Sequence, residues 1–373
     1  MPSFLRKPVF FFLISFSATL VSAQVNAHFD CTPSFPYQAP WLGADVGYSA
    51  PLPDGRDFWI FGDTLYGDKR QVTGDDPRMV RNTVGISTCK NGKWKIDYTI
   101  RRGSDGKLVD FFQAQKSATW YWALSGAEHN NELWVSNLCV RNEPKATSAA
   151  MGFAICGTDL AHVTSLGKDP QKWKIAYFPL TEEAEHVEAG SAALAQDDHL
   201  YLFSLWETGD GRPEILVRIP WAADDPRKQM EYLGSDDQWH AGLEPAKAKL
   251  IMAHGASEMS VHYHADVKKW IAVMVDPNIS SDKVLLRTAP SMTGPWTEGE
   301  VIYHVPELQK DNPHYDKDTF CYAGKEHPEF EKPGELVFTY VCNSMKPKKL
   351  ETEPYIYTPQ VVRMPMPASV MGK

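Results

Sequence analysis

Several features that often reveal a protein's function are missing from this sequence. No basic excess is present, because the formal net charge is −9, whereas a nucleic-acid-binding surface is usually basic. No C-x-x-C pair is present that would indicate a zinc knuckle. After the first 23 residues no apolar run approaches the ~20 residues that a membrane span needs, and no Pro/Ser/Gly-rich linker marks a domain boundary. These absences argue against a nucleic-acid partner, a zinc knuckle and a membrane-embedded mature chain.

The first residues have the pattern of an export signal. Arg6 and Lys7 supply positive charge, residues 9–20 form a short apolar run, and Val21-Ser22-Ala23 fits the small-residue cleavage rule. We therefore expect a signal peptide over 1–23 and a single mature domain over 24–373, secreted or periplasmic, monomeric, and without membrane contact after cleavage. A retained membrane anchor is the alternative interpretation.

The cysteine content suits an oxidising compartment. Six cysteines lie after the predicted cleavage site, and an even number in an exported chain favours disulfides. Sequence alone leaves their pairing open. We expect Cys139–Cys156 and Cys321–Cys342, because each pair would join neighbouring strands, with Cys31–Cys89 left over.

An internal repeat organises the chain. Sustained helical periodicity is scarce, and short β-branched or aromatic runs alternate with polar turns, as in all-β folds. Five such runs follow a turn at intervals of about 70 residues. They occupy residues 58–61, 132–135, 200–203, 270–275 and 336–340. We interpret them as the second strands of five similar hairpins.

A second landmark follows three of these hairpins. Residues 215–218, 284–287 and 360–363 are predicted third strands, and residues 294–297 lead into a fourth. Four strands repeated five times predict an all-β, five-bladed β-propeller with four-stranded antiparallel blades around a central funnel. The predicted blades are roughly 40–105, 115–180, 185–240, 253–306 and 318–366. A β-sandwich is the alternative, but it does not account for the repeat.

The first strand of each blade should line the channel, and its start should lie at the same mouth as the end of the second strand. We therefore compared the residues nine positions before and after each turn centre. In the first four blades these are Asp45 and Asp63, Tyr121 and Cys139, Glu188 and Trp206, and Glu258 and Asp276. The fifth blade offers His327, and Arg81-Asn82 opens a third strand near the mouth of the first blade. The predicted mouth is therefore acidic, with aromatic residues nearby.

Carboxylates with aromatic platforms indicate sugar chemistry. One carboxylic acid can protonate the leaving oxygen while a second carboxylate attacks or activates water, and aromatic faces stack on sugar rings. If Pro53-Asp54-Gly55 is a three-residue hairpin loop, Asp45 lies opposite Asp63 with Cβ atoms about 5 Å apart. Two like charges this close raise one pKa, which separates an acid from a base. A short separation also favours a retaining reaction.

We therefore predict Asp45 and Asp63 as catalytic residues and a set of substrate-binding residues at the same mouth. The set is Glu188, Glu258, Arg81, Asn82, Tyr121, Trp206, Asp276 and His327.

Each of these residues also has a purely structural interpretation. Asp63 and Asp276 could end strands or form turns, and Glu188 and Glu258 could be solvated rim residues. His327 could orient a carboxylate, coordinate a central ion or form hydrogen bonds in the core. Three arginines recur at equivalent positions and are interpreted as ion-pair partners within the blades. They are Arg218, Arg287 and Arg363.

Several motifs resemble one known family. Gly43-Ala44-Asp45-Val46-Gly47, Trp59-Ile60-Phe61-Gly62-Asp63-Thr64 and Arg81-Asn82-Thr83 resemble the opening of an uncharacterised-domain family that includes the family-183 glycoside hydrolases, which are endo-acting D-arabinanases. Residues 256–261 and 291–297 fit as well, so the resemblance covers nearly the whole mature chain. It implies a five-bladed propeller of the wider family-43-like clan. In the D-arabinanases, the aspartates that match Asp45 and Asp63 look like the catalytic pair. Tyr121 departs from the family-43 pattern, which has an aspartate there.

Together these observations predict a secreted glycoside hydrolase that cleaves a furanoside-containing polysaccharide, with arabinan, including D-arabinan, as first choice. Asp45 is the preferred nucleophile or base and Asp63 the preferred acid/base, with exchanged roles left open. No cofactor is expected, and a structural metal ion in the channel is left open. The first alternative is a non-catalytic carbohydrate-binding propeller, and the second is a protein-interaction propeller with a blocked funnel.

Overall fold

A computed structural model describes residues 28–74, 77–143 and 152–372. The predicted signal peptide, residues 1–23, lies outside the described residues. Within these three ranges, no helix has both the length and the apolar character required to cross a membrane.

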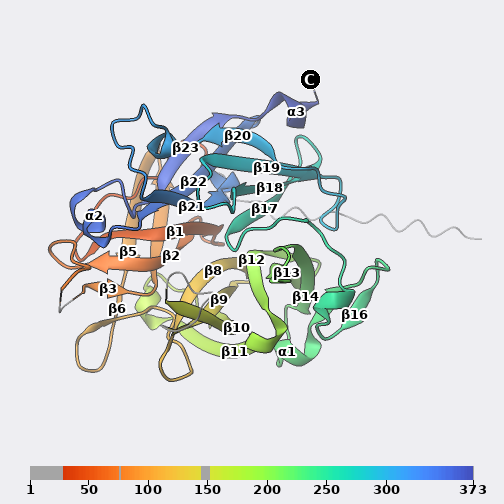
Figure 1. The fold of residues 1–373 in the computed structure, drawn as a ribbon. Helices are drawn as coiled ribbons and strands as arrows, with labels where there is room; N and C mark the ends of the chain where they lie inside the picture. The colour runs from red at the N-terminus through yellow and green to blue at the C-terminus, as the bar shows by residue number, and fades with distance from the viewer. Residues whose placement is uncertain (1–27, 75–76, 144–151, 373) are drawn as a thin grey trace, which may run out of the picture.

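Five small antiparallel sheets form the fold, as predicted (Figure 1). The first sheet contains β1 (Trp41–Pro51), β2 (Asp57–Tyr66), β3 (Met79–Val80), β4 (Thr83–Lys90) and β5 (Lys93–Thr99). The second contains β8 (Thr119–His129), β9 (Glu132–Asn142), β10 (Phe153–Thr164) and β11 (Lys174–Glu182). Between these sheets, β6 (Arg101–Arg102) and β7 (Leu108–Val109) form a short ribbon.

The remaining three sheets continue the ring. The third contains β12 (Val187–Gln196), β13 (His199–Trp206), β14 (Glu214–Pro220), β15 (Glu231–Leu233) and β16 (Trp239–Ala241). The fourth contains β17 (Met259–His264), β18 (Lys269–Val275), β19 (Lys283–Ala289) and β20 (Glu300–His304). The fifth contains β21 (Thr319–Glu326), β22 (Glu335–Ser344) and β23 (Gln360–Pro365). Three short helices lie outside the sheets: α1 (Pro226–Gln229), α2 (Pro347–Thr352) and α3 (Ala368–Met371).

The sheets are the blades of a five-bladed propeller. Their first strands, β1, β8, β12, β17 and β21, contact one another in that order and β21 contacts β1, which closes the ring. Apolar clusters fill the spaces between neighbouring blades; residues of the first two blades share one cluster and residues of the next two share another. Each blade therefore buries its faces against its neighbours, as expected for a repeat fold.

The predicted hairpin and third strands are found, but the number of strands per blade differs from the uniform four that we expected. The second and fourth sheets have four strands, the first and third have five, and the fifth has three in the described part of the chain. The chain turns into α3 soon after β23, so no further strand of the described C-terminal segment adds to this blade. The three recurrent arginines form ion pairs within their own blades, with Glu231, Glu298 and Glu335.

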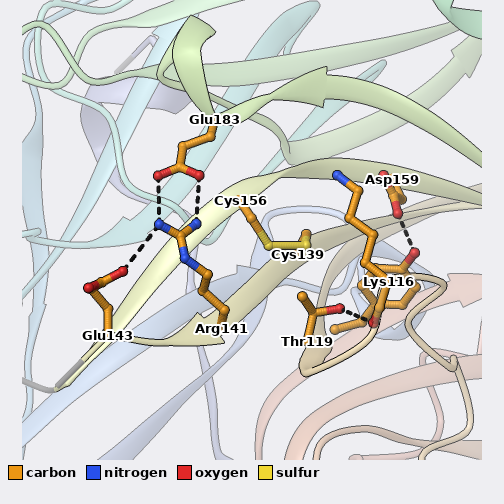
Figure 2. The surroundings of a disulfide bond; sticks show 9 residues. Lys116, Thr119, Cys139, Arg141, Glu143, Cys156, Asp159 and Glu183 are labelled. Atoms are coloured by element: carbon orange, nitrogen blue, oxygen red, sulfur yellow. Dashed lines mark hydrogen bonds and ion pairs between the residues drawn. A yellow bond between two sulfur atoms is a disulfide. The ribbon is translucent and has the colours of Figure 1, made fainter.

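All three predicted disulfides are confirmed. Cys31–Cys89 attaches the N-terminal segment to β4, and Cys321–Cys342 joins β21 to β22. Figure 2 shows Cys139–Cys156, which joins β9 to β10. Nearby, the guanidinium group of Arg141 donates to both carboxylate oxygens of Glu183.

Extra residues interrupt the pairing of most first strands. Register shifts occur in β1, β8, β12 and β21, where first strands from different blades crowd together near the channel axis. Gly324 follows the shift in β21 and lies against the fourth blade: a Cβ atom there would be 2.7 Å from the carbonyl carbon of Met274. The close approach of two backbones thus requires glycine at this position.

We expect Gly324→Ala to lower the free energy of unfolding by about 1–3 kcal/mol, because the added methyl group must displace the fourth blade. Urea denaturation would measure the change. Gly211→Ala is the matched control, because nothing lies within 4 Å of a Cβ atom there. Equal effects of the two substitutions would contradict the proposed close contact.

Candidate active site

Four carboxyl groups gather at one end of the channel. Asp45 lies in β1, Asp63 in β2, Glu188 in β12, and Glu258 immediately before β17. Asp63 and Glu258 both act electrostatically on Asp45, and Glu188 acts on Glu258. The four groups therefore belong to one electrostatically linked cluster.

The first hairpin brings Asp45 close to Asp63, but the pairing of its two strands differs slightly from the pairing that we predicted. The loop has the expected three residues: Leu52 and Arg56 pair across it, and Gly55 has a φ of 77°. Beyond the loop, one extra residue in β1 and one in β2 shift the register and then restore it, so that Ala44 pairs with Thr64. Asp45 and Asp63 are the adjoining residues of the two strands. This result preserves the predicted neighbourhood of the two aspartates.

Small and strained residues fix the position of the Asp45 carboxyl group. It folds over Gly62, where a Cβ atom would overlap Asp45 Oδ1. Val46, the next residue, has a φ of 69°, which is a costly left-handed conformation for a β-branched side chain. Such strain is held in place only where the surrounding structure imposes it, and it concentrates at functional sites.

Asp45 is surrounded by neutral hydrogen-bond donors. The hydroxyl groups of Tyr322 and Tyr357 donate to its Oδ2 atom over 2.7 and 3.1 Å, whereas Oδ1 has no hydrogen-bond partner. Burial and the nearby charges of Asp63 and Glu258 raise the pKa of Asp45 well above its usual range, and the two tyrosines oppose this shift. Asp45 therefore favours the protonated state.

Asp63 has a cationic partner instead. Arg81 Nη1 donates to its Oδ2 atom over 3.1 Å, and Trp122 Nε1 donates to its Oδ1 atom over 3.0 Å. Burial raises the pKa of Asp63 to about 6, while Arg81 and Trp122 lower it and Asp110 raises it. Asp63 is therefore largely ionised near neutral pH, and the two aspartates differ in the way that acid–base catalysis requires.

The other two carboxyl groups also have basic neighbours. Burial raises the pKa of Glu258 to about 7, against the lowering effect of Lys325. Lys325 is fully buried in β21, and burial lowers its pKa to about 8. Arg212 Nη2 lies 3.2 Å from Glu188 Oε1, and burial raises the pKa of Glu188 more than Arg212 lowers it. These two pairs place groups of both signs at the channel mouth.

An aromatic wall stands beside Asp63. The rings of Trp120 and Trp122 have centroids 6.2 Å apart, Phe153 contacts Trp122 at 4.6 Å, and the Arg81 guanidinium lies 4.5 Å above the Trp120 ring. Phe153 and Glu188 also line a cavity of about 350 Å³. A cavity of this size is within the range of small-ligand sites.

The Cys139–Cys156 disulfide braces the strands beneath this cavity. Ala154, Ile155 and Gly157, which flank Cys156 in β10, are part of the cavity lining, and so is Glu183. Figure 2 shows the Arg141–Glu183 ion pair near this disulfide. The cavity wall is thus held by one covalent and one ionic cross-link.

Two of the predicted substrate-binding residues are structural. Asn82 is fully buried; its amide donates to the carbonyl groups of Phe112 and Tyr121 and accepts from the Phe112 N–H group. Tyr121 is also fully buried, and its hydroxyl group donates to Asp159. Counting back from the hairpin turn selected Tyr121 because β8 contains an extra residue between Ala123 and Ser125. The neighbouring Trp122 is the residue that reaches Asp63.

Three other predicted residues make contacts within the fold. The Trp206 ring packs against the apolar cluster between the second and third blades. Asp276 accepts hydrogen bonds from the Asn278 N–H group and the Ser281 hydroxyl group, so it stabilises a turn. His327 is fully buried between Ser49 and Thr339, and burial lowers its pKa to about 3. His327 follows the last residue of β21, at the opposite end from the mouth, and its two ring nitrogens are already hydrogen-bonded.

The sequence analysis missed several residues of the site, including Trp120 and Phe153 of the aromatic wall. Trp122, Tyr322 and Lys325 could have been found by allowing for the bulges in β8 and β21, because a bulge changes which side chain faces the channel. Tyr357 lies in the loop between α2 and β23, and Arg212 lies in the loop before β14. Neither loop has the alternation of apolar and polar residues that would have indicated which side chains face the channel.

The raised pKa of Asp63 has a consequence for stability. Because the folded state binds a proton more tightly than the unfolded state, stability is highest below about pH 4 for this group and falls as the pH rises to about 6. We expect this group to lower the free energy of unfolding of the wild type by about 2–3 kcal/mol between pH 4 and pH 8. In Asp63→Asn this contribution should be absent, so the variant should lose less stability over the same pH range.

Urea denaturation at both pH values would measure the difference. Asp97→Asn is the control, because the Asp97 side chain is 59% exposed. A wild-type pH dependence that persists unchanged in Asp63→Asn would show that burial does not penalise this charge.

Comparison with known proteins places the chain in a family. No curated protein matches it. Among solved structures, it matches a "putative hydrolase" from Bacteroides ovatus at 18% identity and a TM-score of 0.65, covering 88% of this chain and 86% of that one. An exo-1,5-α-L-arabinanase from a bovine ruminal metagenomic library matches at 13% identity and a TM-score of 0.46, covering 89% and 95%. An endo-arabinase from Bacteroides thetaiotaomicron matches at 13% identity and a TM-score of 0.45, covering 90% and 98%.

The Bacteroides ovatus structure shares the fold with this chain. The family model described as "Domain of unknown function (DUF5005)" matches residues 34–364. This match spans all five blades, including the segments that carry Asp45, Asp63, Glu188 and Glu258. The chain therefore belongs to the DUF5005 family.

Proposed function

We propose that this protein is a secreted glycoside hydrolase that cleaves a furanoside-containing polysaccharide. The observation that carries the proposal is the unequal environment of two neighbouring aspartates. Asp63 is paired with the Arg81 guanidinium, whereas Asp45 is bonded only to neutral tyrosine hydroxyl groups. This difference supplies an anion and a proton donor side by side, which is the combination that glycoside hydrolysis requires.

The local charges favour a specific division of roles. Asp45, which favours the protonated state, donates its proton to the leaving glycosidic oxygen. Asp63, held ionised by Arg81, attacks the anomeric carbon and forms a glycosyl ester as the glycosidic bond breaks. Asp45 then takes a proton from water, whose oxygen cleaves the ester and regenerates both groups. This assignment reverses the preference from the sequence, which favoured Asp45 as nucleophile because of its small neighbours.

The short connection between the two aspartates supports a retaining reaction. They come from adjoining positions of paired strands, and paired strands lie about 5 Å apart. Retaining glycosidases place their carboxyl groups about 5–5.5 Å apart, whereas inverting enzymes leave room for water.

Two features support the choice of substrate. The aromatic wall of Trp120, Trp122 and Phe153 offers ring faces for stacking, and Glu188 and Glu258 can accept hydrogen bonds from sugar hydroxyl groups. The choice of an arabinan, D-arabinan above all, rests on the resemblance of the segments around Asp45 and Asp63 to the family-183 glycoside hydrolases. The three disulfides support a secreted or periplasmic location, and we propose a monomer.

Incubation with plant and mycobacterial arabinans, followed by chromatography of the released sugars, tests this function. We expect the wild type to release arabinose-containing products. Asp45→Asn and Asp63→Asn should each reduce kcat by at least about 10³-fold, because one loses the acid and the other the nucleophile.

Asp97→Asn is the control and should retain activity, because Asp97 lies on the outer strand β5 and its side chain is 59% exposed. Binding of glycans without turnover by the wild type would indicate the alternative, a non-catalytic carbohydrate-binding propeller. Neither turnover nor glycan binding would contradict both functions.

The role of Asp45 as the acid can be tested through Tyr322. The Tyr322 hydroxyl group stabilises the ionised form of Asp45, so Tyr322→Phe should raise the pKa of Asp45 further. We expect the alkaline limb of the kcat/KM profile to move to higher pH by about 0.5–1 unit.

Tyr355→Phe is the matched control, because the Tyr355 hydroxyl group bonds only to the His314 carbonyl at the surface. A shift confined to the acidic limb in Tyr322→Phe would instead identify Asp45 as the group that must be ionised.

A further inference from the structure

A second cluster of ionisable groups lies at the opposite end of the channel. His264 is the last residue of β17, Glu326 is the last residue of β21, and Glu331 follows the single turn of 3-10 helix at Pro328–Phe330. One ligand atom from each of the three lies within 4.8 Å of the others. Glu258 precedes β17 by one residue, so six residues, or about 20 Å of extended chain, separate it from His264. This cluster is therefore distinct from the proposed active site.

His264 and Glu326 are buried and Glu331 is half-buried, and two of the atoms that face each other have no hydrogen-bond partner. His264 is 8% exposed and Glu326 is 1% exposed. His264 Nε2 and Glu326 Oε1 lie 3.0 Å apart, yet neither atom has a hydrogen bond of acceptable geometry. A buried polar atom without a partner is costly and calls for an explanation.

One carboxylate oxygen of Glu326 and one of Glu331 already have hydrogen-bond partners. His262 Nδ1 lies 3.1 Å from Glu326 Oε2, and the Val337 N–H group donates to Glu331 Oε1 over 2.7 Å. Of the other oxygens, Glu326 Oε1 lies 3.0 Å from His264 Nε2, and Glu331 Oε2 lies 4.0 Å from His264 Nδ1. Supporting hydrogen bonds that orient a ligand while leaving one lone pair free are typical of metal sites.

We propose that His264, Glu326 and Glu331 bind one divalent transition-metal cation of the zinc type. One imidazole nitrogen and two carboxylate oxygens form a ligand set that zinc accepts, with a further position for solvent. Two ligands at about 2.1 Å from a metal are about 3.0–3.4 Å apart at angles of 90–110°. The separation of His264 Nε2 and Glu326 Oε1 lies at the lower end of this range, whereas Glu331 Oε2, 4.0 Å from the other ring nitrogen, must move closer when the cation binds.

The local charge also favours a cation. Glu329 and Asp266 add negative charge around Glu331, beyond that of Glu326. Within the described residues, the groups opposing this charge are imidazoles, His262 and His264. A divalent cation would offset the two ligating carboxylates directly. The alternative arrangement is a protonated His264 paired with Glu326, with a proton on Glu331.

The proposed site would join two blades. His264 belongs to the fourth blade, and Glu326 and Glu331 to the fifth. The first strands of these blades, β17 and β21, are neighbours (Figure 1). Metal binding should therefore stabilise the folded protein and should not be required for hydrolysis at the other end of the channel.

Titration of the chelator-treated full mature protein with ZnCl₂ tests the proposal. We expect one equivalent to bind, measured by calorimetry and by elemental analysis after gel filtration. The melting temperature should rise by roughly 5 °C at a hundredfold excess over Kd. Co²⁺ at the same site should give visible absorption bands of low coordination number, and Glu331→Gln should weaken zinc binding at least tenfold.

His240→Asn is the matched control. His240 lies 2.9 Å from Asp236 in an exposed pair, which resembles the site chemically but lacks a third ligand. Retention of the zinc equivalent in this variant and its loss in Glu331→Gln support the proposal. A folded wild type that binds no zinc at millimolar concentration, or loses it with His240→Asn, overturns the proposal, whether or not Glu331→Gln folds. Because turnover is not the readout, the result is independent of the proposed hydrolase activity.

Discussion

Mutual repulsion among buried carboxyl groups at one mouth of the channel governs the arrangement of this protein. Asp45, Asp63, Glu188 and Glu258 converge there because the ring of blades directs the starts of its first strands to one point. Burial removes the water that would stabilise four negative charges. The carboxyl groups have different partners: Arg81 lies beside Asp63, Lys325 lies near Glu258, and Asp45 has only hydroxyl groups as hydrogen-bond donors. The proposed hydrolysis depends on this inequality of the partners more than on the number of acids.

The repeat architecture could be read from the sequence because its signal is local. Each second strand is a short apolar run after a polar turn, and both the turn and the run are set by neighbouring residues. Two of the disulfide pairs followed from the same strand order, and Cys31–Cys89 was the pair left over. The fifth blade differed from expectation because its third strand is followed by the C-terminal segment, and the number of strands in a blade depends on which segments meet in space.

The site was only partly predictable, for a related physical reason. Asp45 and Asp63 were found because the two register shifts in their hairpin compensate each other. In β8 a single uncompensated shift moved the prediction from Trp122 to the buried Tyr121. In the fifth blade, His327 was chosen although it lies near the hairpin end of the strand, whereas Tyr322 faces the mouth. Bulges arise where first strands crowd at the axis, and no local pattern marks them.

The short N-terminal segment before β1 has a consequence for how the ring stays closed. No strand from one end of the described chain completes the sheet at the other end. Instead, His28 N–H donates to the Glu329 carbonyl and the Cys31 carbonyl accepts from Arg363, both in the fifth-blade region, while the Cys31 sulfur is bonded to Cys89 in the first blade. The N-terminal segment thus connects the last blade to the first, by hydrogen bonds on the fifth-blade side and by a disulfide on the first-blade side. A reducing environment would break this disulfide and leave only hydrogen bonds between the N-terminal segment and its neighbours, so the compartment in which the chain folds affects how firmly the ring is closed.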